Sequence, residues 1–89
     1  MLARMLAAAG QADAPTRQAV ERAMGAADIA RQEGAGAALT YRLEHCALLL
    51  LFAVDAAGEV RLSEAHPSPR HAGAPAPSLD QCAAEAPAR

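Results

Sequence analysis

Residues 39–62, LTYRLEHCALLLLFAVDAAGEVRL, hold most of the large apolar side chains of this chain. The first part alternates apolar and polar residues, which is typical of a strand with one exposed face. Residues 46–54 are apolar at every position, and Asp55 to Gly58 then supply turn-forming residues before a second alternating run. We therefore predict a buried antiparallel hairpin over residues 38–64.

A helix is the alternative interpretation of residues 39–54. Leu39, Leu43, Ala47, Leu50 and Val54 also recur near the helical period, and Leu and Ala are strong helix formers. The strand is favoured by the turn residues at 55–58 and by the alternating run that follows them.

A strand that is apolar on both faces needs cover on both sides. We expect a helix on one face and either another subunit or the C-terminal tail on the other. The predicted interaction residues belong to this strand and to the helix expected before it, and they are Leu48, Leu50, Phe52, Val54 and Ile29.

One or two helices are expected before the hairpin. Residues 2–9 place apolar side chains at helical spacing, and Gly10 ends that run. A longer helix is predicted over residues 15–33, with a stripe of small apolar residues and with Gly34 just past its end. Ile29 falls on the opposite face of this helix, as an isolated exposed side chain or as a second contact to a partner.

The composition changes after Glu64. Four prolines predict an extended arm over residues 65–77. Ser78 and Gln81 have the spacing of a capping box, so a short terminal helix should follow and end near Pro87. The predicted fold is a small α+β domain over residues 1–64, followed by a proline-rich arm with a short C-terminal helix over residues 65–89.

The inventory of core side chains is small. Hydrophobic residues make up 53% of the 89 residues, but 26 of those 47 residues are alanine. A chain this short buries only about 60% of its unfolded surface. We therefore expect the core to be completed by a protein partner, as a homodimer or a hetero-oligomer.

Charge and composition argue against several other partners. The net charge is −2, and the eight basic residues, all arginine, are spread along the chain, so nucleic acid is not an expected partner. The excess of Arg and Ala indicates a GC-rich, bacterial genome. The apolar run over residues 47–54 is too short to span a membrane as a helix, which takes about 20 residues. Arg4 interrupts the N-terminal apolar run, so we expect no secretion signal and a cytoplasmic location. Intracellular cysteines are usually reduced, so reduced thiols are expected at Cys46 and Cys82, and a disulfide between the two is the alternative.

No constellation of residues specifies a reaction, and we expect neither catalysis nor a cofactor. The predicted function is a non-enzymatic interaction or assembly module, such as an accessory subunit or adaptor. The alternative is a small metal- or ligand-binding domain. Its candidate ligands, which lack the close pairing typical of zinc sites, are His45, His66, His71 and Cys82.

Overall fold

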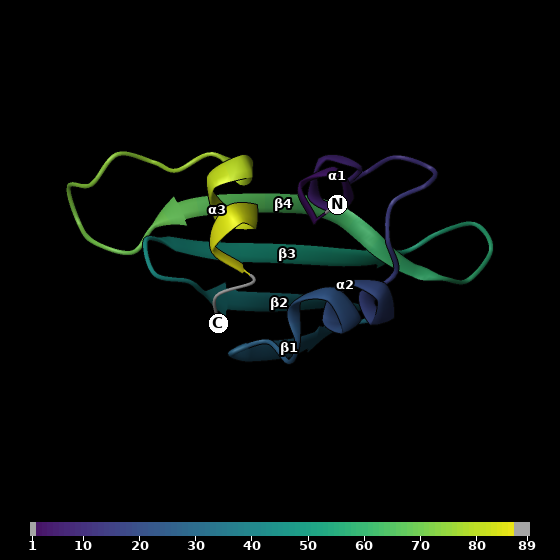
Figure 1. The fold of residues 1–89 in the computed structure, drawn as a ribbon. Coiled ribbons are helices and arrows are strands. Elements are labelled where there is room, and N and C mark those ends of the chain that lie inside the picture. Colours follow the sequence, from purple (N-terminus) through teal and green to yellow (C-terminus); the bar gives the residue numbers. More distant parts are fainter. Residues whose placement is uncertain (1, 87–89) are drawn as a thin grey trace.

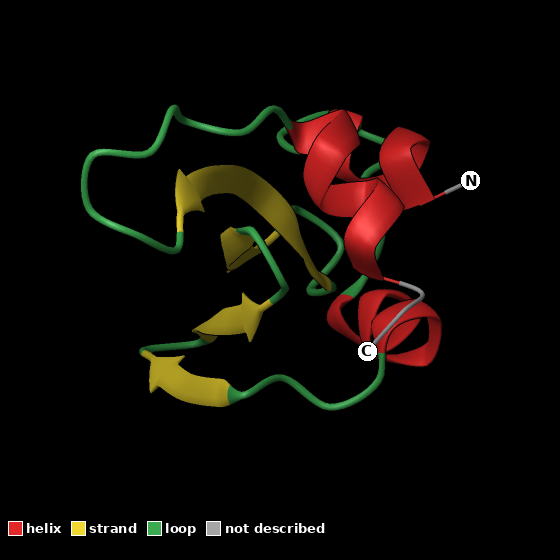
Figure 2. Cartoon of the chain, turned by 60° about the vertical axis from the view of Figure 1, so that its left-hand side comes forward, coloured by secondary structure: helices red, strands yellow, loops and turns green. Residues whose placement is uncertain are grey.

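Three helices pack on one face of a four-stranded antiparallel sheet (Figures 1 and 2). The structure is a computed structural model and describes residues 2–86. The predicted α+β fold is confirmed, with helices at both ends of the chain. Its elements are α1 (Leu2–Ala7), α2 (Arg17–Met24), β1 (Ile29–Glu33), β2 (Gly36–Arg42), β3 (Cys46–Val54), β4 (Val60–Pro69) and α3 (Leu79–Glu85).

The strands follow one another in the order β1-β2-β3-β4, and every neighbouring pair is antiparallel. The predicted turn between β3 and β4 is present. The Asp55 carboxylate accepts hydrogen bonds from the backbone N–H groups of Ala57 and Glu59, and Gly58 adopts a positive φ of 84°. This turn chemistry is local, which is why the sequence could predict it.

Residues 39–54 form two strands, so both the single strand and the alternative helix expected there are wrong. The chain turns at residues 43–45, where the Leu43 N–H donates to the Cys46 carbonyl over 2.7 Å. No Gly or Pro marks this turn. It forms because β2 and β3 pair with each other along most of their length.

The helix predicted over residues 15–33 is also too long. Thr16 caps α2 by accepting the Ala19 N–H, and the helix ends at Met24, where Gly25 takes a φ of 82°. The Tyr41 hydroxyl donates to the Gly25 carbonyl over 2.8 Å, which ties this helix end to β2. Residues 29–33 then pair with β2 as a strand. Pairing across the sheet overrides the weak helical periodicity of residues 29–33.

Strand β4 continues to Pro69, five residues beyond the point where the composition predicted an arm. Pro67 and Pro69 are compatible with this strand because it lies at the edge of the sheet, where one side of the backbone needs no ladder hydrogen bonds. The predicted terminal helix is confirmed as α3, with the reciprocal capping box of Ser78 and Gln81. Its predicted end near Pro87 lies outside the described residues.

The core lies between the sheet and the helices. Its largest fully buried side chains come from β2, β3, β4 and all three helices, and they are Tyr41, Leu6, Leu39, Leu48, Leu50, Leu62, Val20, Cys46 and Cys82. The face of the sheet away from the helices contributes none of them.

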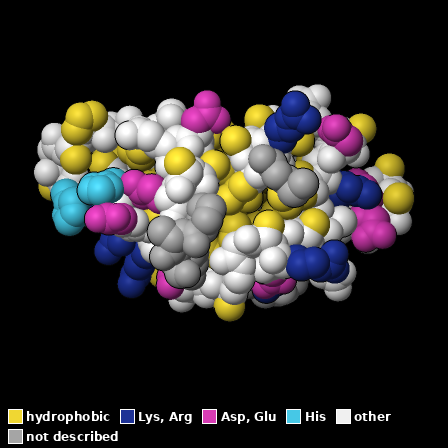
Figure 3. All heavy atoms as spheres, in the orientation of Figure 1, with side chains coloured by type: hydrophobic (Ala, Val, Ile, Leu, Met, Phe, Trp, Pro, Cys, Tyr) yellow, Lys and Arg dark blue, Asp and Glu magenta, His cyan; other side chains and the backbone are white. Residues whose placement is uncertain are grey.

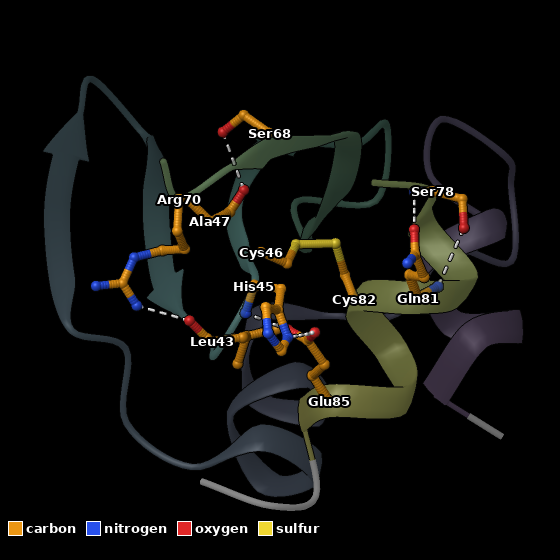
Figure 4. Close-up of a disulfide and its surroundings, with 10 residues drawn as sticks. All are labelled: Leu43, His45, Cys46, Ala47, Ser68, Arg70, Ser78, Gln81, Cys82 and Glu85. Atoms are coloured by element: carbon orange, nitrogen blue, oxygen red, sulfur yellow. Dashed lines mark hydrogen bonds and ion pairs between the residues drawn. A yellow bond between two sulfur atoms is a disulfide. The ribbon is translucent and has the colours of Figure 1, made fainter. Parts of the chain in front are cut away.

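Cys46 and Cys82 form a disulfide that ties α3 to the start of β3 (Figure 4). The expectation of two reduced thiols is therefore wrong. The cysteines are 36 positions apart in sequence, and the fold brings their Cα atoms to 5.6 Å. Beside the disulfide, Glu85 accepts the backbone N–H of His45 over 2.9 Å, which gives α3 a second attachment to the β2–β3 turn.

Candidate functional site

The helix-free side of the sheet is the candidate site. Directly opposed residues of antiparallel strands share a face, so the strand register identifies the side chains that lie on it. Two complete rows cross all four strands there, Ile29–Thr40–Leu49–His66 and Arg31–Ala38–Leu51–Glu64. We call these eight residues the open sheet face.

The centre of the open sheet face is apolar. Leu49 is 36% exposed, Ile29 in the same row is 39% exposed, and Leu51 is half-buried. Among these eight residues the Arg and Glu side chains lie on the two edge strands, with Arg31 on β1 and Glu64 on β4. The exposed Arg42, at the end of the central strand β2, lies on the same side of the sheet beyond the two rows. The solvent face of an antiparallel sheet is usually polar across its centre, so leucines in these positions are a feature to be explained.

The structure divides the predicted interaction residues between the two sides of the sheet. Leu48, Leu50 and Phe52 lie beneath the helices and are buried, so their assignment to an interaction surface is corrected. Val54 follows the same alternation but is 44% exposed at the end of β3, and Ile29 lies on the open sheet face.

The turn at residues 43–45 explains this correction. In a continuous strand, Leu48 and Leu50 would point away from Leu39 and Tyr41. The turn changes the alternation, so all four side chains lie on the helix side. The residues that sequence reasoning missed are therefore Leu49 and Leu51, and recognising this turn would have identified them.

The candidate metal ligands do not come together. The sulfur of Cys82 is bonded to Cys46, His66 lies 2.8 Å from the Glu64 carboxylate, and His45 lies 3.0 Å from that of Glu85. His45 and His71 line one hollow. Histidine side chains gather at one end of the molecule (Figure 3). Within residues 2–86, no group of three or more His, Cys, Asp or Glu side chains is placed to hold a metal ion.

Two carboxylates are stabilised in their charged form by the fold. The backbone N–H of Glu59 is the main cause that lowers the pKa of Asp55 below its ordinary value of 3.8, and Arg61 adds to the effect. The backbone N–H of His45 lowers the pKa of Glu85 below 4.5, with a further contribution from the His45 ring. One carboxylate holds the β3–β4 turn, and the other joins α3 to the β2–β3 turn.

These lowered pKa values predict acid sensitivity. Each carboxyl has a lower pKa in the folded state than in the unfolded state, so its stabilising contribution is present above the unfolded value and is lost as the pH falls through the folded value. We expect the free energy of unfolding to decrease when the pH is lowered from about 6 to about 3. Urea denaturation across this range measures the decrease. The Asp55→Asn/Glu85→Gln variant should show a shallower dependence, and a slope equal to that of the unaltered protein would contradict the assignment.

Comparison with protein-family models, with curated proteins and with solved structures finds no match to this chain. None of the helices within residues 2–86 has the length and apolar character required to cross a lipid bilayer. The function must therefore be inferred from the chemistry of the surfaces described above.

Proposed function

We propose that this protein is a non-enzymatic interaction module that binds a protein partner through the open sheet face. The observation that carries the proposal is the pair of exposed side chains Ile29 and Leu49, which share one cross-strand row on a face that no helix covers (Figure 2). Thr40 lies between them in that row, and Leu51 extends the apolar surface along β3 next to Leu49. Exposed apolar side chains that gather on one face and are rimmed by polar residues are typical of protein interaction sites.

The alternative function, binding of a metal or small ligand by the histidines and Cys82, has less support. The disulfide occupies the Cys82 sulfur, and two of the three histidines have carboxylate neighbours of their own. The interaction function requires only residues that are already together on one face, so it is the function we favour.

We also propose that the protein works in an oxidising compartment, in place of the cytoplasmic location predicted from the sequence. Disulfides persist in secreted and periplasmic proteins and are rare in the reducing cytoplasm. The Cys46–Cys82 bond joins α3 to the sheet and closes the loop that contains β4, so it has a structural position in the fold.

Site-specific photocrosslinking in extracts of the source organism tests the proposed function. A benzoylphenylalanine at Leu49 should yield a covalent adduct with one defined protein segment, identified by mass spectrometry, whether from this chain or from another. The matched control carries the same group at Val54. Val54 is also exposed, but it belongs to the set of alternating β3 residues on the helix side of the sheet and not to the open sheet face. Loss of the Leu49 adduct in a Leu51→Asp background supports the proposal, and equal yields at the two positions would refute it.

A further inference from the structure

We infer that the occupant of the open sheet face is a second copy of this chain, packed face to face about a twofold axis that runs parallel to the strands between β2 and β3. This inference rests on the proposed function and specifies its partner. The axis places β1 opposite the partner's β4, and β2 opposite the partner's β3, because the strand order is β1-β2-β3-β4. Such an interface uses the same patch on both subunits.

The sizes of the central side chains favour this axis. On the open sheet face, β2 presents the small residues Ala38 and Thr40, whereas β3 presents Leu49 and Leu51. The proposed axis sets the leucines of each copy over the small residues of the other. A twofold axis that runs parallel to the sheet but perpendicular to the strands would instead set β3 opposite the partner's β3 and β2 opposite the partner's β2. Leucines would then face leucines, and the small residues would face small residues. Close packing of large against small side chains is what packed sheets require.

The charges at the two edges favour the same axis. Arg31 on β1 and Glu64 on β4 belong to one cross-strand row, at opposite edges of the sheet. The axis brings Arg31 of each copy opposite the partner's Glu64, so two ion pairs flank the leucines. Within residues 2–86, Arg31 is exposed and makes no ion pair of its own. Charge complementarity of this kind sets register and suppresses other arrangements.

The extent of the sheet sets the expected strength of the dimer. Four strands spaced about 4.8 Å apart, each with about seven residues rising about 3.3 Å each, cover an area of roughly 400 Å². A standard interface buries about 800 Å² on each partner. The dimer should therefore be of moderate affinity, and we expect its dissociation constant to be micromolar.

Charge reversal across the axis tests the inference, with analytical ultracentrifugation of the full, oxidised chain as the measurement. Arg31→Glu and Glu64→Arg each place like charges opposite each other, and each should raise the dissociation constant about tenfold or more. An equimolar mixture of the two variants should recover the affinity of the unaltered protein, because every facing pair is then opposite in charge. The Arg31→Glu/Glu64→Arg variant should recover it as well.

Two controls separate this geometry from general charge effects. A mixture of Arg22→Glu and Glu59→Arg, which alter exposed residues outside the open sheet face, should dimerise like the unaltered protein. Val54→Asp should also leave the dissociation constant unchanged, whereas Leu49→Asp should abolish dimerisation. Circular dichroism confirms that each variant is folded.

The outcomes distinguish this inference from the proposed function. A dimer whose charge-reversed variants do not recover on mixing overturns the proposed axis. A folded monomer up to about 100 μM, well above a micromolar dissociation constant, overturns the second copy as the occupant. If that monomer still gives the Leu49-dependent adduct with another protein, the proposed function stands without the inference, and if it gives none, both are overturned.

Discussion

Replacing Cys46 and Cys82 together with alanine is expected to lower the free energy of unfolding by about 3–4 kcal/mol. The disulfide joins residues 36 positions apart, and a cross-link of that length removes much of the conformational entropy of the unfolded chain. Small domains have a total stability of only about 5–15 kcal/mol. This one bond is therefore expected to supply a large share of the stability.

The effect should be concentrated in α3. This helix has seven residues, too few to be stable alone in water, and the residues that it buries are small, namely Cys82 and Ala83. Without the disulfide, its remaining attachments are contacts with α1 and the sheet and the hydrogen bonds between Glu85 and His45. Hydrogen exchange in α3 should accelerate more than exchange in β3.

Urea denaturation of the alanine variant measures the loss of stability, and dithiothreitol treatment of the unaltered protein should reproduce it. The matched control is dithiothreitol treatment of the alanine variant, which should change nothing further. A loss below about 1 kcal/mol would contradict a structural role for the bond.

The second large effect is a contrast between neighbouring leucines. Leu50→Ala should destabilise the protein by about 2–5 kcal/mol, because Leu50 is completely buried beneath the helices and truncation leaves a cavity. Leu49→Ala should cost about 1 kcal/mol or less, because Leu49 lies on the open sheet face, where its side chain is 36% exposed and no helix packs on it.

Urea denaturation measures the free energy of unfolding of both variants. The protein concentration is kept at or below the low micromolar range, because association then adds little to the measured stability. Leu50→Ala should leave the open sheet face unchanged, whereas Leu49→Ala should weaken partner binding. Equal destabilisation by the two substitutions would contradict the register of β3, since a shift of one residue exchanges the two faces of a strand.

The sequence by itself determined the features that depend on neighbouring residues. These include the α+β fold class, the presence of a helix at residues 2–9, which the structure ends at Ala7, the turn at Asp55 to Gly58 and the capping box of Ser78 and Gln81. The alternation of buried and exposed residues from Leu39 to Glu44 is also confirmed. Turn, cap and alternation signals act within a few residues, so one sequence is enough to reveal them.

Only the tertiary structure decided the features that depend on distant contacts. Pairing with β2 converted residues 29–33 from an expected helix into a strand, and the turn at residues 43–45 placed Leu48 and Leu50 in the core and Leu49 on the open sheet face. The approach of Cys46 to Cys82 is likewise a product of the whole fold. Contacts between residues far apart in sequence leave no local pattern, and in this protein those contacts determine which leucines remain available to a partner.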